Sequence, residues 1–402
     1  SKIRSKISDR RKKIIGRWLR TPSYERLFFR VPLWAKNGGK NLGVEKMSDK
    51  SVIGYWISEK KRQKFNCNDF HNVCAKEGLV LKQVDINSNL DAQGPFHIFL
   101  HKLTDVLAHA ETGDRNATSI VTRVQEYIHR HPEMIVIDPL ENVRNLRNRH
   151  KSYEIIQAGM QSNDVFTPNF VEITSKNVTE NLSHLRRFGI KFPFICKPLL
   201  AHGSSDAHKM MVIFNEKGLK DCQPPCVAQD FVNHSAILYK VFIVGNNFDV
   251  VERPSLKNFY AADCESPHTL FFSSHDISKI GSNSEWSVIS AEDEALRVQP
   301  NYEIFEHIVA RVTKIFGLVL VGVDVVIENH SGKYAIIDVN VFPGYDGYPN
   351  FSKHLVESMK RLLIELRNCR QNSRACTLKK CLSDDLDSGF ESDEKKKKES
   401  MK

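Results

Sequence analysis

Short apolar runs alternate with polar stretches of helical length in the first part of the chain. Runs of strand length lie at 52–57, 79–84 and 96–100. A long helix is expected around 120–131, and the alternation continues up to Pro139. This pattern predicts a small α/β subdomain over 51–140 with a largely parallel sheet.

Two further segments follow in the apolar pattern. Strands are predicted at 194–197, 211–214, 226–229 and 238–244. A helix is expected over 301–316, before the last apolar runs. We therefore expect a central lobe over 141–244 and a C-terminal lobe over 245–367, with no internal repeat.

The last apolar runs carry two acids and an amide. Asp338 and Asn340 are two positions apart on one predicted strand, so they share a face. Asp324 lies on the preceding run, across a hairpin signal at 329–333. Burying these groups among Val and Ile is costly without a cation. Because Mg²⁺ prefers oxygen ligands and keeps positions for substrate phosphates, the hairpin predicts a phosphoryl-transfer metal site.

The two ends of the chain differ from the middle in composition. Residues 1–50 are rich in Arg and Lys, and we expect a flexible basic extension there; a targeting leader and a nucleic-acid-binding arm are the alternatives. The chain does not begin with Met, so we expect its start to be incomplete. Residues 368–402 are polar and poor in aromatic side chains, which predicts a disordered tail. Within it, 387–392 resembles a phosphorylation-dependent degradation signal.

Composition narrows the class of protein. A chain of 402 residues exceeds one compact core, and its net charge of +10 indicates an anionic partner such as nucleic acid, an acidic membrane surface or a polyphosphorylated metabolite. The nine cysteines show no CxxC pair or zinc-type spacing, which argues against a disulfide framework and favours the cytosol or the nucleus. No apolar run approaches the roughly 20 residues of a membrane span, so we expect a soluble protein.

Lys197 ends a short apolar strand directly before the loop His202-Gly-Ser-Ser-Asp-Ala-His208. Its ammonium would project over this loop, whose amides suit a phosphate. Either histidine of the loop is a candidate phosphate donor. The alternative is an ordinary surface loop with solvated histidines.

Residues 229–240 leave one predicted strand, cross a polar linker and enter another. The pattern resembles an interlobe hinge, where backbone groups contact an adenine edge between apolar side chains. Lys240 lies within the second strand and points either to solvent at a sheet edge or into the cleft beside the metal strands. The segments 253–257 and 274–279 add further cations and hydroxyls. No Walker loop, protein-kinase motif set or nucleophile elbow is present.

Seven segments in order resemble the inositol-tetrakisphosphate 1-kinases, also called inositol-1,3,4-trisphosphate 5/6-kinases. They are Ser58-Glu-Lys-Lys61, His101-Lys-Leu-Thr-Asp105, Lys151-Ser-Tyr153, Phe192-Pro-Phe-Ile-Cys-Lys197, Tyr239-Lys-Val-Phe242, Arg253-Pro-Ser-Leu-Lys-Asn258 and Ile337-Asp-Val-Asn-Val-Phe-Pro-Gly344. The resemblance covers about 52–366. It implies an α/β (α+β) ATP-grasp fold, with a Rossmann-like subdomain followed by two lobes whose antiparallel sheets enclose the nucleotide.

The resemblance also implies roles for individual residues. Asp324 and Asp338 would bind Mg²⁺, with Asp338 bridging two ions and Asn340 completing the second. The residues implied for the inositol phosphate are Lys61, Lys102, His208, Lys240, Arg253, Asn340 and Gly344. Those implied for ATP are Arg149, Lys197, Gln229, Asp230, Phe231, Val232, Asn233, His234, Ser235, Ala236, Ile237, Leu238, Tyr239, Lys240, Ser255, Ser274 and Ser278.

Lys240 and His208 are the implied catalytic residues, and no general base is evident. The loop at 202–208 is one residue longer than the usual family form, which leaves open which of its histidines faces the substrate. The implied reaction is Mg²⁺-assisted transfer of the ATP γ-phosphoryl to inositol 1,3,4-trisphosphate at position 5 or 6, or to inositol 3,4,5,6-tetrakisphosphate at position 1. We expect a cytoplasmic, also nuclear, monomer.

Two other functions use parts of the same pattern. An ATP-grasp carboxylate-amine ligase would share the nucleotide and metal residues but activate a carboxylate. A basic scaffold would bind nucleic acid through 1–50, with a steep salt dependence. We do not favour the scaffold because the interleaved aromatic platform of single-strand binders is missing.

Overall fold

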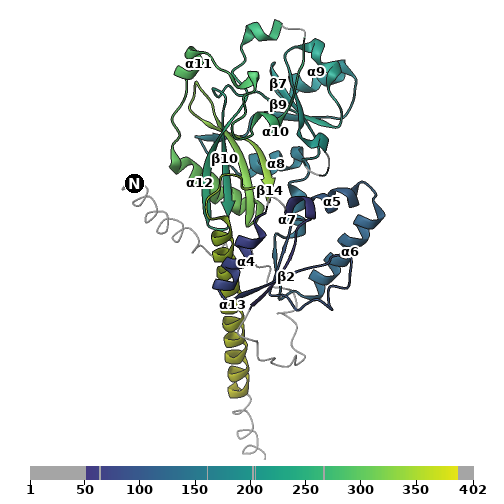
Figure 1. The fold of residues 1–402 in the computed structure, drawn as a ribbon, viewed down its shortest axis with the longest axis vertical. Coiled ribbons are helices and arrows are strands. Elements are labelled where there is room, and N and C mark those ends of the chain that lie inside the picture. The colour runs from purple at the N-terminus through teal and green to yellow at the C-terminus, as the bar shows by residue number, and fades with distance from the viewer. Residues whose placement is uncertain are drawn as a thin grey trace, which may run out of the picture.

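A computed structural model gives the fold and describes residues 51–62, 65–160, 162–201, 203, 205–265 and 268–387. The predicted basic extension 1–50, His202 and the segment 388–402, with most of the degradation-like motif, lie outside the described residues. Within them the strands form one four-stranded and two five-stranded sheets (Figure 1). No helix among these residues is long and apolar enough to cross a membrane.

The N-terminal sheet is parallel throughout, as the alternating pattern predicts. Its order is β2 (Leu79–Gln83), β1 (Ser51–Trp56), β3 (Ile98–His101) and β4 (Ile135–Ile137). The covering helices include α4 (Cys67–Lys76), α5 (Thr104–Glu111) and α6 (Arg115–Arg130). Helix α6 buries Ile120, Val121, Val124 and Tyr127, a stripe at helical spacing that fixes which face meets the core.

The second sheet is antiparallel and has the order β12 (Leu270–Ser273), β8 (Lys209–Ile213), β7 (Phe194–Pro198), β9 (Cys226–Asp230) and β6 (Phe170–Ile173). Apolar side chains from these strands and from α9 (Val178–Arg187) form a separate core on one face. The other face carries Lys197 and Gln229 toward the third sheet.

The third sheet has the order β11 (Asn247–Pro254), β10 (Ile237–Val244), β13 (Leu320–Ile327), β14 (Tyr334–Val341) and β5 (Val165–Phe166). Its neighbours are antiparallel except β14 and β5. Strands β10 and β13 are buried along almost their whole length, which explains their continuous apolar sequences. Helices α8 (Arg149–Gly159) and α12 (Tyr302–Phe316) contact this sheet.

Sheet membership crosses the ranges 141–244 and 245–367. Strand β10 ends the first range but pairs with β13, and β12 from the second range is an edge of the second sheet. Helix α13 (Phe351–Asp387) continues through 368–387, where we expected tail. Leu, Ala, Lys and Arg in this stretch favour helix, although few aromatic residues are present to signal a core.

A buried acid joins the N-terminal subdomain to the third sheet. Asp138 follows β4, and its carboxylate accepts hydrogen bonds from the backbone N–H groups of Val319 and Leu320 at 2.7 and 3.0 Å. Burial raises the pKa of Asp138 to about 7, against the lowering effect of these two donors. The contact fixes the start of β13, the strand that carries Asp324.

Candidate functional site

Two acids and a lysine form one row across three adjacent strands. Asp324 on β13 is the register partner of Lys240 on β10 and of Asp338 on β14. Directly opposed residues on neighbouring strands point to the same face, so all three side chains meet there. Asn340 lies two positions beyond Asp338 on that face. The structure therefore brings the predicted metal ligands together and points Lys240 to them rather than to solvent.

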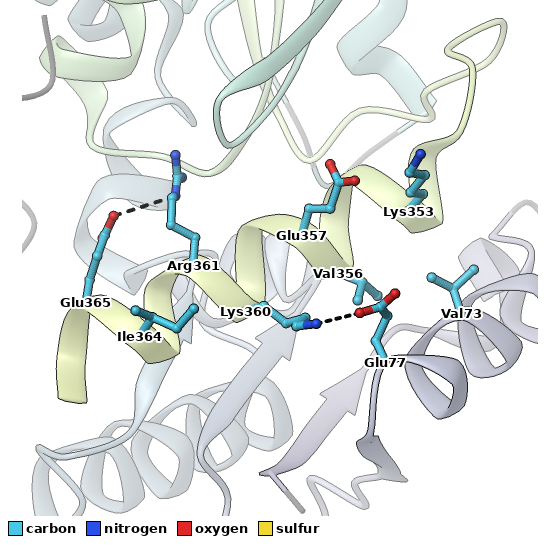
Figure 2. A pocket seen from close by; sticks show the side chains of 9 residues that line it. All are labelled: Val73, Glu77, Lys353, Val356, Glu357, Lys360, Arg361, Ile364 and Glu365. Carbon is cyan, nitrogen blue, oxygen red and sulfur yellow. Dashed lines mark hydrogen bonds and ion pairs between the residues drawn. The ribbon is translucent and has the colours of Figure 1, made fainter. Parts of the chain in front are cut away.

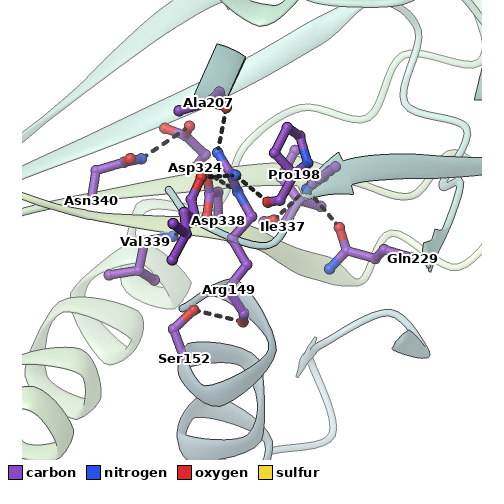
Figure 3. Close-up of polar contacts among 12 residues, drawn as sticks. Arg149, Ser152, Pro198, Ala207, Gln229, Asp324, Ile337, Asp338, Val339 and Asn340 are labelled. Carbon is purple, nitrogen blue, oxygen red and sulfur yellow. Dashed lines mark hydrogen bonds and ion pairs between the residues drawn. The ribbon is translucent and has the colours of Figure 1, made fainter. Parts of the chain in front are cut away.

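The side chains of this row are mostly buried and lie close to one another. Lys240 Nζ lies 3.1 Å from Asp324 Oδ1. Asn340 Nδ2 lies 3.5 Å from Asp324 Oδ2 (Figure 3). Arg149 Nε lies 3.7 Å from Asp338 Oδ2, with both side chains almost fully buried. Burial raises the pKa of Asp324; Lys240 opposes this effect and the Asp338 carboxylate adds to it. We call Lys240, Asp324, Asp338 and Asn340 the carboxylate cluster.

A β-bulge connects Lys197 to this cluster. The pairing of β13 with β14 skips Ile337, since Asp324 pairs with Asp338 and Val325 with Ile336. A bulged residue leaves the ladder, which frees its backbone for another partner. Lys197 Nζ, from the second sheet, donates to the Ile337 carbonyl at 2.8 Å. The same ammonium donates to Gln229 Oε1 at 2.7 Å, so it spans the space between the two sheets.

Lys197 is 4% exposed, and its surroundings perturb it. Burial lowers the pKa of Lys197 to about 8, with Asp338 and Asp324 opposing the shift and Arg149 adding to it. Its third partner is the Tyr153 hydroxyl at 3.2 Å, a residue that we had not assigned to the site. A buried lysine titrating near neutrality is typical of a functional position.

Arg149 holds the loop that follows β7. Its guanidinium donates to the carbonyls of Pro198 and Leu200 at 2.6 and 3.2 Å and to that of Ala207 at 3.1 Å. These bonds fix both ends of the loop between β7 and the short 3₁₀ helix Ser205–His208. Arg149, predicted from resemblance to contact ATP, thus positions this loop beside Asp338.

The donor set fits a magnesium ion. Asp324 and Asp338 are two carboxylates directly opposite each other; Asp338 is buried and the Asp324 side chain is 14% exposed, and Asn340 adds an amide. Among the described residues no group of three or more His, Cys, Asp and Glu side chains could hold a metal by itself. A partial cage of this kind suits Mg²⁺, which retains water and substrate phosphates as ligands.

The predicted hinge is held by polar contacts within the protein. Asn258 Oδ1 accepts from the backbone N–H groups of His234 and Ser235 at 3.0 and 2.9 Å, and Asn258 Nδ2 donates to Asp293 at 2.8 Å. Ser235 and Ala236 both have positive φ, 50° and 55°, which is uncommon for residues other than glycine. Asn258 therefore stabilises an irregular hinge, a role that spacing alone did not indicate.

The predicted ATP serines lie at two places. Ser255 donates its hydroxyl to His234 Nε2 at 2.7 Å, because His234 Nδ1 donates to the Val232 carbonyl at 2.6 Å. Burial lowers the pKa of His234 to about 4, so this ring is neutral at physiological pH. Ser274 and Ser278 lie on and just after α10 (Ser274–Ile277), next to β12.

The cations of the N-terminal subdomain form a second group. Lys61 Nζ lies 2.7 Å from Asp105 Oδ2 and 3.1 Å from Thr104 Oγ1. Lys102 Nζ donates to the Pro343 carbonyl at 3.5 Å and lies 4.7 Å from the centre of the Phe342 ring. Lys102 thereby touches the loop that follows the metal strand β14. The resemblance did not identify Asp105 as the partner of Lys61.

Arg253 and Gly344 lie around the same loop. The Arg253 guanidinium, 6% exposed, donates to the Asp346 carbonyl. A Cβ at Gly344 would lie 3.0 Å from Asp346 Oδ2, so a side chain there is crowded. We call Lys61, Lys102 and Arg253 the outer cations, since each lies outside the carboxylate cluster and contacts a partner of its own.

A separate groove lies between α4 and α13 and contains none of the predicted site residues (Figure 2). Lys360 of α13 forms an ion pair with Glu77 across it. Its lining residues are Val73, Glu77, Lys353, Val356, Glu357, Lys360, Arg361, Ile364 and Glu365. The carboxylate cluster, not this groove, marks the candidate active site.

Two family models match this chain. The model of the inositol 1,3,4-trisphosphate 5/6-kinase ATP-grasp domain matches residues 159–361, and that of the pre-ATP-grasp domain of the same kinases matches 52–143. The first of these includes β7, the hinge and the carboxylate cluster. The second corresponds to the parallel sheet.

Relatives and solved structures give the same family and fold. The chain is 40% identical to an inositol-tetrakisphosphate 1-kinase of Xenopus laevis and 39% identical to that of Danio rerio, over 77% of this chain and 78% of each relative. The D-cycloserine synthetase DcsG has a similar structure, with a TM-score of 0.54, 11% identity and coverage of 78% of this chain and 100% of its own. At that identity the likeness concerns the fold alone. The chain belongs to the inositol 1,3,4-trisphosphate 5/6-kinase family, with the ATP-grasp fold.

Proposed function

We propose that this protein is an ATP-dependent kinase that phosphorylates ring hydroxyls of inositol polyphosphates. The family membership and the names of the relatives support the reaction and the substrate class. The finer substrates are inositol 1,3,4-trisphosphate, phosphorylated at position 5 or 6, and inositol 3,4,5,6-tetrakisphosphate, phosphorylated at position 1. The cytoplasmic or nuclear location and the monomeric state stay predictions.

The row of Lys240, Asp324 and Asp338 is the observation that carries the assignment. It places the Lys240 ammonium beside two largely buried carboxylates, and Lys197 contacts the Ile337 carbonyl directly before Asp338. Phosphoryl transfer depends mainly on positioning and on stabilising charge at the transferring group. Lys197 would hold ATP phosphates from the second sheet, and Lys240 would contact both the nucleotide and the acceptor.

We assign two Mg²⁺ ions to the carboxylate cluster. Asp324 and Asp338 would hold the first, and Asp338 and Asn340 the second. When bound, the ions neutralise charge on the phosphates. Lys197 and Lys240 keep their ammonium groups aimed at the same region, so charge neutralisation would be shared between protein and metal.

The outer cations would bind the phosphates of the acceptor. Each charge-assisted contact in a partly desolvated pocket contributes on the order of 1.5–3 kcal/mol, so several are needed for a polyanion that repels ATP. Lys61 lies on the short helix α3 (Glu59–Arg62), Lys102 directly follows β3, and Arg253 lies on β11. His208, from the 3₁₀ helix held by Arg149, would add a hydrogen bond. Acceptor binding would thus draw on several separate elements.

The test is ADP release with Mg²⁺-ATP and each of the two inositol phosphates. D-alanine and a dicarboxylic acid serve as ligase controls. The proposal expects ADP release only with an inositol phosphate, together with a product that carries one more phosphate. Release that depends on an amino or carboxylic acid would instead indicate a ligase.

A further inference from the structure

The pairing of β8 with β12 brings a second histidine to the acceptor side. Ser273, the last residue of β12, is the register partner of Lys209, the first residue of β8. His208 directly precedes Lys209, and His275 follows Ser273 by two positions. In an antiparallel pair, the residue before one strand lies beside the residues after the other. Two distant segments therefore meet at their ends.

The two imidazole rings touch in an edge-to-face arrangement. Their centroids lie 4.7 Å apart, and their planes meet at 87°. This geometry is favourable for aromatic rings because the positive edge of one meets the negative face of the other. His275 is the exposed member, whereas His208 is half-buried. An exposed ring in this arrangement supports its neighbour from the solvent side.

The backbone next to each of the two histidines is held in place by contacts with the rest of the protein. Arg149 holds the carbonyl of Ala207, the residue directly before His208. On the other side, Ile277 of α10 is 4% exposed and packs in the core formed by Ile195, Val212, Phe259 and Leu270. The Ser273 hydroxyl accepts from the Asp276 N–H at 3.4 Å and so caps α10. The contact between the rings thus follows from the packing of two anchored segments.

We propose that His275 is a positioning residue that orients the imidazole of His208 toward the acceptor phosphates. The inference rests on the proposed function, in which His208 contacts the inositol phosphate. A fixed ring loses less freedom when it binds a phosphate, so orientation strengthens binding without a contact between His275 and substrate. In sequence His275 lies between Ser274 and Ser278, two of the serines that the resemblance assigns to ATP, but its ring contacts His208.

The groups around His208 shift the pKa of its imidazole. Burial lowers the pKa of His208; His275 on α10, Arg149 on α8 and Lys240 on β10 add to the shift, and Asp338 on β14 opposes it. Asp206 and Lys209, its neighbours in sequence, form an ion pair with each other. Removing the His275 imidazole should therefore raise the pKa of His208, whereas the edge-to-face contact survives if an aromatic ring remains.

The kinetic test compares His275→Ala with His275→Phe. Loss of an aromatic pair should raise KM for the inositol phosphate about three- to tenfold in His275→Ala, with KM for ATP unchanged. His275→Phe keeps the ring contact and should return KM to within about twofold of the original value. In His208→Ala the additional change His275→Ala should have no further effect, because the two residues act as one unit. The proposal would be overturned if His275→Phe were as impaired as His275→Ala. It would also be overturned if the effects of His208→Ala and His275→Ala were additive.

A second readout does not depend on turnover. The imidazole Hε1 resonance of His208, assigned by its disappearance in His208→Gln, is followed by NMR against pH in the full chain. We expect its ring-current shift to be lost in His275→Ala and retained in His275→Phe, with a raised pKa in both. An unchanged resonance in His275→Ala would overturn the inference even if the kinase assay succeeds. Failure of the native protein to phosphorylate any inositol phosphate, with the NMR changes present, would overturn the proposed function instead.

Discussion

The carboxylate cluster and the outer cations are built in different ways. The cluster comes from adjacent strands of one sheet, whose register sets the separation of Lys240, Asp324 and Asp338. The outer cations come from separate elements, and each is held by a local partner such as Asp105 or a backbone carbonyl. A rigid sheet suits chemistry that needs fixed geometry, whereas side chains on several elements suit recognition of a large polyanion. The comparison predicts that changes in the carboxylate cluster affect kcat and that changes in the outer cations affect KM for the acceptor.

The largest effect is expected for Asp338→Asn. The substitution keeps the shape of the side chain but removes the charge that bridges the metal ions in our proposal. We expect kcat to fall about 10³-fold, as when a key electrostatic group is lost, with KM for the acceptor nearly unchanged. The measurement is initial-rate ADP release with saturating substrates. Asp164→Asn, at an exposed position, is the matched control; equal losses in both variants would contradict the metal assignment.

Lys197→Met should come next and should be specific to ATP. Loss of its ammonium removes a charge-assisted phosphate contact, so kcat/KM for ATP should fall ten- to hundredfold at pH 7. Because the pKa of Lys197 is lowered to about 8, its charge is present below that pH and lost above it. In the native protein kcat/KM for ATP should therefore decline as pH rises above about 8.

The pH profile sharpens this prediction. In Lys197→Met the decline above pH 8 should disappear, because no ammonium remains to titrate there. Lys191→Met is the control, because Lys191 is exposed and the substitution removes the same single positive charge. A decline that persists unchanged in Lys197→Met would show that another group causes it.

Lys61→Met should produce a smaller effect on the acceptor side alone. Its ammonium is partly exposed and is already paired with the Asp105 carboxylate. Solvent and this ion pair therefore weaken its contact with a phosphate. We expect KM for the inositol phosphate to rise about tenfold, and the salt dependence of KM to become less steep. Steady-state kinetics at two ionic strengths would measure both. An unchanged KM, or a loss of kcat as large as in Asp338→Asn, would break the division between the two groups.

Phe342→Leu is expected to have the smallest effect. Leucine fills much of the space but removes the ring over which Lys102 lies. A cation–π contact of about 0.5–1 kcal/mol corresponds to a two- to fivefold rise in KM for the acceptor. Thermal unfolding should be followed in parallel, because Phe342 also packs on Phe65 and Tyr345. A change in unfolding temperature without a change in KM would assign Phe342 to packing only.

The carboxylate cluster could be predicted from sequence because its residues obey local rules. Asp338 and Asn340 share a face by strand periodicity, and a short hairpin returns the chain from Asp324. Lys197 was likewise marked by its place between a strand and a loop. The parallel N-terminal sheet followed from alternating helix and strand signals in the same way.

Features that depend on strand register could not be predicted. The bulge at Ile337 turns its carbonyl to Lys197, and nothing in the local sequence places it there. The contact of His275 with His208 requires the pairing of β12 with β8, which joins segments far apart in the chain. The family resemblance assigned Arg149 to ATP but did not indicate its three bonds to the loop before His208.

The central claim is that the carboxylate cluster and the outer cations form one site for phosphoryl transfer. The most direct test is to incubate the protein with Mg²⁺ and ATP labelled in the γ-phosphoryl group, together with inositol 3,4,5,6-tetrakisphosphate, and to identify the labelled product. We predict label on a pentakisphosphate with the native protein and with Asp164→Asn, and none with Asp338→Asn. Label found only as free phosphate, or on the inositol with Asp338→Asn as fast as with the native protein, would contradict the account.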